Sequence, residues 1–167
     1  MLRVADGTVR VLAVLNWVFM GIFAVLLFAT VFVRGQFLGA LVKGIPNLDT
    51  ATAIDAIRIV MLLGIGGGAA AAYIFVQLRN IFASVRTGDA FEPENGMRIR
   101  RIAWGLAAVQ VLDLGFGAVA GSVERAVGTP VDWGFALTGW LVILLLFVLA
   151  EVWMQGSAMR DELKGTI

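Results

Sequence analysis

The sequence predicts an all-α fold: a transmembrane antiparallel four-helix bundle, with a cytoplasmic helical hairpin that extends between the second and third spans. Three observations predict it. Apolar residues make up 60% of the 167 positions, against about 45–50% in soluble domains. Four apolar stretches are each long enough to cross a bilayer, which takes about 20 helical residues. Basic residues lie mostly on one side of these stretches.

The four predicted spans cover residues 11–33, 53–78, 102–123 and 131–154 of a single membrane domain, residues 1–167. A helix satisfies its own backbone hydrogen bonds, as the hydrocarbon core requires. The first span is longer than the ~7–15 apolar residues of a signal peptide, and no A-x-A cleavage site follows it. We therefore expect the first span to remain in the protein.

With four spans, the two termini and the hairpin formed by residues 79–101 lie on the same side of the membrane. Four of the 13 basic residues lie on the opposite side, namely Arg34, Lys43, Arg58 and Arg125. The other nine lie on the side of the termini: Arg3, Arg10, Arg79, Arg86, Arg98, Arg100, Arg101, Arg160 and Lys164. The positive-inside rule then places both termini and the hairpin in the cytoplasm.

Tryptophan positions agree with this orientation, because indole rings favour the headgroup level. Trp104 begins the third span and Trp153 ends the fourth, both at the predicted inner interface. Trp133 begins the fourth span at the outer interface. Trp17 and Trp140 lie deeper, where we expect them to pack between helices.

The connections between the spans contain residues that are typical of turns and helix ends. Gly88 is expected to take the left-handed position that ends the helix continuing from the second span. Pro93 prevents that helix from continuing, and Asn95 is the predicted N-cap of the helix that becomes the third span. In the outer loop, residues 34–52, apolar residues recur at helical spacing and indicate a short helix on the membrane surface.

The composition excludes several classes of chemistry. The chain has no cysteine and no histidine, which excludes disulfides, Cys/His zinc sites and a Ser-His-Asp triad. It also lacks paired carboxylates at a clear spacing, so we expect no enzyme, no catalytic residue, no metal and no cofactor. A net charge of +1 gives no reason to expect direct nucleic-acid binding.

The sequence "GIGGGA", Gly64–Ala69, fits the form of a dinucleotide-binding loop. That motif requires a preceding strand and an acidic residue about 20 positions on, whereas this one lies inside a span. We interpret Gly64–Ala72 as small residues that let a neighbouring helix approach closely. Gly117 and Gly121 form a similar pair, which also offers a surface for a homo-oligomer.

Polar residues within the spans form a second group of candidates. Asp113 lies near the middle of the third span, and Gln110 lies one turn earlier on the same face. A charged carboxylate there costs at least ~2.5–3.5 kcal/mol, so it needs a partner, water or a proton. Asn16, Tyr73 and Gln77 are expected to complete a polar cluster. The cluster is either a proton or cation site, or a structural acid that hydrogen-bonds two helices.

The stretch "SVRTGDAFEPENGMRIRRIAW" resembles the cytoplasmic hairpin of the domain of unknown function 2975 family (DUF2975), small bacterial four-span membrane proteins. The matching residues are Gly88, Asp89, Phe91, Glu94, Asn95, Arg98, Ile99, Arg101 and Ile102. Ala90 replaces a usual proline, and Pro93 is an addition. The resemblance implies a multi-pass protein of the bacterial plasma (inner) membrane, whose first partner is the lipid bilayer.

Members of that family are often encoded beside a very small helix-turn-helix regulator. The resemblance therefore implies a regulatory membrane partner of a small cytoplasmic helix-turn-helix protein. Its candidate partner-binding residues are Gly88, Asp89, Phe91, Glu94, Asn95, Arg98 and Arg101. The alternative function is a small oligomeric channel or transporter that uses Asp113 and Gln110, with Asn16 and Tyr73 nearby.

Overall fold

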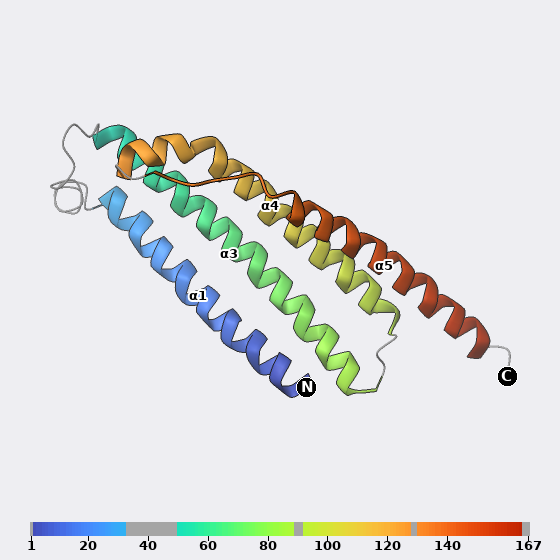
Figure 1. The fold of residues 1–167 in the computed structure, drawn as a ribbon. Helices are drawn as coiled ribbons and strands as arrows, with labels where there is room; N and C mark the ends of the chain where they lie inside the picture. The colour runs from blue at the N-terminus through green and yellow to red at the C-terminus, as the bar shows by residue number, and fades with distance from the viewer. Residues whose placement is uncertain (1, 33–49, 89–91, 128–129, 165–167) are drawn as a thin grey trace. The chain divides into compact units, whose positions relative to one another are not determined.

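The computed structural model describes residues 2–32, 50–88, 92–127 and 130–164, and these residues form four helices (Figure 1). They are α1 (Leu2–Phe32), α3 (Thr50–Arg86), α4 (Pro93–Val127) and α5 (Leu137–Lys164). No strand occurs among the residues described. Each helix contains a segment long and apolar enough to cross a membrane. The predicted all-α membrane protein is therefore confirmed, whereas the predicted helix of the outer loop falls at residues 33–49, outside the described residues.

The helices differ from the predicted spans mainly at their ends. All four extend into charged sequence: α1 begins at Leu2, α3 continues to Arg86, α4 begins at Pro93 and α5 continues to Lys164. Helical hydrogen bonding can continue past an apolar segment, so hydropathy marks only the apolar portion of each helix. The fourth helix begins at Leu137, later than the predicted span, because the preceding residues include Pro130 and Gly134, which disfavour helix.

The described chain divides into two compact units. Unit 1 comprises Met1–Asn16, Ala70–Gln110 and Ala136–Ile167. Unit 2 comprises Trp17–Ala69 and Val111–Phe135. The long helices α1, α3 and α4 each contribute one part to each unit, whereas α5 lies in unit 1.

In unit 1, α3 and α4 run antiparallel. Ser84 of α3 hydrogen-bonds Asn95 of α4. Ile74, ten residues before Ser84, faces Gly105, ten residues after Asn95. A Cβ at Gly105 would lie 2.7 Å from Ile74 Cγ1, so glycine is what allows this approach. The helix α5 packs closely on α4: a Cβ at Gly96 would lie 3.2 Å from the backbone oxygen of Ala150, and the Trp104 and Phe147 rings meet edge to face at 5.3 Å.

In unit 2, the glycines of α3 receive side chains from its neighbours. A Cβ at Gly64 would collide with the Phe23 ring of α1. A Cβ at Gly66 would lie 3.3 Å from Leu112 of α4. The interpretation of this stretch as a packing surface is confirmed at these two positions. Gly117 of α4 lies directly under the Trp133 ring, whereas a Cβ at Gly121 would meet no other atom of the described residues within 4 Å.

Arg58 ties α1 to α3 in the same unit. It pairs with Asp55 at 3.4 Å on its own helix. It also donates a 2.9 Å hydrogen bond from Nη2 to the backbone oxygen of Thr30 on α1. The side chain of Arg58 is only 24% exposed, so most of it is covered by the protein.

Large apolar side chains cover the outside of α1 and α5. On α1 they include Val14, Val18, Phe28 and Phe32, and on α5 they include Leu141, Leu144, Leu145 and Val148. Such continuous exposure is costly in water and natural in lipid. The expectation that Trp17 packs between helices is wrong, because its side chain is 63% exposed on this same apolar surface.

Candidate functional site

A buried pair of polar side chains joins α3 to α4 near their connection. Asn95 on α4 has no exposed surface and Ser84 on α3 is 7% exposed. Asn95 Nδ2 donates a 2.7 Å hydrogen bond to Ser84 Oγ, and the Ser84 hydroxyl donates at 2.9 Å to the backbone oxygen of Ile81. Buried polar groups are stable only when paired, and this pairing requires the observed register of the two helices.

Arg98 extends this pair into a network. Its Nη1 donates to Asn95 Oδ1 at 2.8 Å and to Glu92 at 2.9 Å, while its Nη2 contacts Glu94 at 3.1 Å. The Arg98 side chain is 13% exposed, so its charge is balanced mostly inside the protein. We call Ser84, Glu92, Glu94, Asn95 and Arg98 the hairpin network. It brings together three of the residues that the sequence selected for partner binding, namely Glu94, Asn95 and Arg98.

The start of α4 differs from the expected N-cap. The helix begins at Pro93. At the first position of a helix the backbone N–H has no partner within the helix, so proline, which lacks it, fits there. Asn95 therefore lies within the first turn, and its backbone nitrogen donates to the Glu92 oxygen at 2.9 Å. The expectation that Asn95 caps the helix is wrong, because its side chain faces α3 and bonds Ser84 instead.

The remaining hairpin candidates lie around the turn. Gly88 has a φ of 92°, the left-handed conformation that glycine adopts without a steric penalty, as predicted. Arg101 is exposed on α4. Asp89 and Phe91 lie outside the described residues, so their proposed contact with a partner stays a prediction.

Three of the intramembrane candidates, Gln110, Tyr73 and Asn16, lie in unit 1. Gln110 of α4 lies against Gly139 of α5 and lines a cleft of about 190 Å³ whose other walls are mostly apolar, including Leu106, Val109 and Val142. Tyr73 is 45% exposed. Asn16 is half-buried and contacts another residue.

Asp113 belongs to unit 2. Its side chain is half-buried and makes no hydrogen bond or ion pair with any residue that the structure describes. Asp113 and Gln110 share one face of α4 through their spacing. The expected hydrogen bond from Asp113 to a second helix is thus not present within the described ranges.

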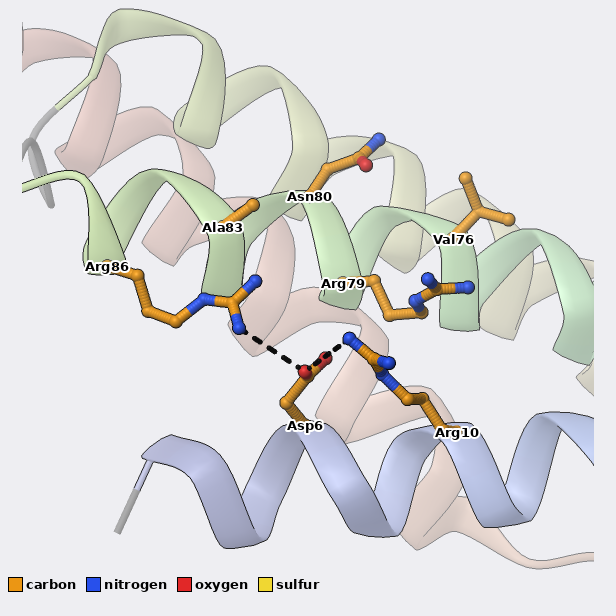
Figure 2. Close-up of a pocket in the computed structure, with 7 residues that line it drawn as sticks. All are labelled: Asp6, Arg10, Val76, Arg79, Asn80, Ala83 and Arg86. Atoms are coloured by element: carbon orange, nitrogen blue, oxygen red, sulfur yellow. Dashed lines mark hydrogen bonds and ion pairs between the residues drawn. The ribbon is translucent and has the colours of Figure 1, made fainter.

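A cleft that the sequence did not predict lies between the beginning of α1 and the end of α3 in unit 1. Asp6 and Arg10 from α1 face Arg79 and Arg86 from α3 across it (Figure 2). From the sequence, these arginines were only markers of the inner side. Asp6 and Arg10 are four residues apart on α1, and Arg79 and Arg86 are seven residues apart on α3, so each pair lies on one face of its helix. These spacings were the only signal in the sequence, because the convergence of the two faces depends on how the two helices align.

Comparison with known proteins gives one match. Residues 13–167, nearly the whole chain, match the family described as "Protein of unknown function (DUF2975)". No curated protein and no solved structure matches the chain. The matched range includes the hairpin residues that carry the resemblance and reaches all four helices that are long and apolar enough to cross a membrane. The chain is therefore a membrane protein that belongs to the DUF2975 family.

Proposed function

We propose that this protein is a regulatory membrane partner, which holds a small cytoplasmic helix-turn-helix protein at the end of the α3–α4 hairpin. The observation that carries the proposal is the hairpin network. A simple connection between two spans needs only a turn, yet here a fully buried asparagine and a nearly buried arginine fix the helix ends. Such rigidity is useful for recognition, because a preordered surface loses less entropy on binding.

The contacts within the hairpin network favour other residues for direct contact with the partner. Arg98 and Asn95 are occupied within the hairpin network, so their role in binding would be to hold the surface in place. Arg100 and Arg101 lie two and three residues after Arg98 on α4 and are exposed. We propose that these two arginines contact an acidic or polar surface of the partner, together with the turn at Gly88. Charged residues of this kind act mainly on encounter and specificity.

The test is affinity purification from native membranes in mild detergent, followed by mass spectrometry of the retained proteins. The double variant Arg100→Gln, Arg101→Gln is compared with Arg125→Gln, a control at the far end of α4. We expect a small DNA-binding protein to be retained by the wild type and the control, and lost from the double variant. Wild-type protein that retains no DNA-binding protein would overturn the proposal.

Asp113 supports a second candidate function, an oligomeric channel or transporter. A half-buried carboxylate without a hydrogen-bonding partner among the described residues is unusual within a span, since such groups normally face water or a partner. In an oligomer, Asp113 and Gln110 would line the path of a proton or cation. Reconstituted Asp113→Asn protein should then lose ion flux in liposomes with unchanged thermal stability. Equal flux in both proteins would exclude this function.

A further inference from the structure

The cleft between α1 and α3 in unit 1 carries an excess of positive charge. Its volume is about 260 Å³, and its lining includes Asp6, Arg10, Val76, Arg79, Asn80 and Arg86. Three arginines face one aspartate, which leaves two positive charges without an acidic counterpart. The volume exceeds the ~30 Å³ share of one water molecule several times over, so the cleft has room for a polyatomic anion.

Asp6 organises two of the three arginines. Its side chain is only 10% exposed, and its Oδ2 accepts from Arg10 Nη2 at 3.0 Å and from Arg86 Nη1 at 3.5 Å. Figure 2 shows the two guanidinium groups directed at Asp6 from two sides. A guanidinium has five N–H donors, so each arginine keeps several for another acceptor. The carboxylate thus holds Arg10 and Arg86 in place without using up their donors.

Arg79 is the third arginine and differs from the other two. It is exposed and makes no hydrogen bond or ion pair with any described residue. Figure 2 accordingly shows no line from Arg79 to Asp6. Planar guanidinium groups match the oxygens of a phosphate in pairs. A phosphate in the cleft would therefore meet one free arginine and two arginines already oriented by Asp6.

The position of the cleft along both helices indicates where such a phosphate would come from. On α1, the residues directly after Arg10 are apolar and several are exposed, including Val11 and Leu12. On α3, the exposed Val76 marks the end of the apolar portion, and Arg79 follows one turn later. Both helices change from apolar to basic at the cleft. In a membrane protein, this change occurs at the level of the lipid headgroups.

We propose that this cleft is a phosphate-binding site, with Arg79 as its free donor and with Arg10 and Arg86 positioned by Asp6. The site takes the phosphate of an anionic phospholipid headgroup, whose acyl chains would lie along the exposed apolar residues of α1. Free phosphate offers the same oxygens without those chains. The two sources share one recognition chemistry, and the apolar surface beside the cleft favours the lipid.

Native mass spectrometry of the detergent-solubilised full chain separates these sources. The probes are phosphatidylglycerol, the zwitterionic phosphatidylcholine, and inorganic phosphate as a competitor. The variant Arg79→Gln is compared with Arg125→Gln, which removes the same charge from an exposed position outside the cleft. Because Arg79 contacts no described residue through a hydrogen bond or ion pair, its variant should fold normally, and circular dichroism checks this.

We expect one phosphatidylglycerol to remain bound to the wild type and to Arg125→Gln. Binding should be about tenfold weaker in Arg79→Gln, the loss typical of one charge-assisted contact. Phosphatidylcholine should not be retained, and inorganic phosphate should not displace the bound lipid. Displacement by inorganic phosphate that depends on Arg79 would overturn the lipid source. Equal weakening in the two variants, or no retained anionic lipid and no bound phosphate, would overturn the site.

Discussion

Asn95 on α4 donates a hydrogen bond to Ser84 on α3 over 2.7 Å, and neither residue is accessible to solvent beyond a few per cent. This contact fixes the register of the hairpin at its charged end, where helix packing by apolar residues alone would allow sliding. Arg98 completes the pairing by donating to the Asn95 oxygen at 2.8 Å. The conformation of the hairpin therefore depends on Asn95, which bonds both Ser84 and Arg98.

Replacing Asn95 by alanine should destabilise the protein by about 1–3 kcal/mol, because Ser84 and Arg98 would each lose a buried partner. Thermal unfolding in detergent, followed by circular dichroism, measures the change. Arg100→Ala, an exposed substitution on the same helix, serves as the control and should change stability by less than about 0.5 kcal/mol. Equal stability of Asn95→Ala and wild type would show that the buried pairing contributes nothing.

The glycines of α3 offer a matched pair of substitutions. A Cβ at Gly64 would collide with the Phe23 ring, whereas a Cβ at Gly67 would meet nothing within 4 Å among the described residues. Gly64→Ala should cost about 1–3 kcal/mol, because an aromatic ring must move as a whole to make room. Gly67→Ala should be neutral or stabilising by up to about 1 kcal/mol. The same loss of stability in both variants would argue against close packing at Gly64.

Truncation of Arg58 should cost more stability than truncation of Asp55. Arg58→Ala removes a charged donor from the backbone oxygen of Thr30 and should cost about 1.5–3 kcal/mol. Asp55 is 72% exposed, so Asp55→Ala should cost no more than about 1 kcal/mol. Comparing unfolding temperatures of the two variants in the same detergent measures the difference. A larger loss in Asp55→Ala would mean that the exposed ion pair, and not the contact with α1, gives Arg58 its role.

Asp6 should stabilise unit 1 through its two arginines. Asp6→Asn keeps the size of the side chain but removes its charge, which leaves Arg10 and Arg86 repelling each other across the cleft. We expect a loss of about 1 kcal/mol, since both arginines remain about half exposed and are screened by solvent. The loss should shrink as salt is raised. A salt-independent effect would point to lost packing instead of lost charge.

The sequence was sufficient for the features that depend on neighbouring residues. Four apolar runs predicted four spanning helices, and the conformation of Gly88 followed from the helix end before it. Contacts between helices were harder to predict from the sequence, because they depend on how the helices align along their axes. Asn95 was expected to cap its own helix, and its true partner Ser84 lies eleven residues earlier on another helix. The convergence of Arg10, Arg79 and Arg86 on one cleft likewise depends on how α1 aligns with α3.

Four spans should place the α3–α4 hairpin on the cytoplasmic side, opposite the connection that precedes α5, and the proposed function depends on this orientation. The chain has no cysteine, so a single cysteine at the exposed positions Thr87 or Asp132 reports each side directly. Right-side-out and inverted membrane vesicles would be treated with a membrane-impermeant maleimide. We predict that Thr87→Cys is labelled only in inverted vesicles and Asp132→Cys only in right-side-out vesicles. Labelling of both positions from the same side would contradict the orientation.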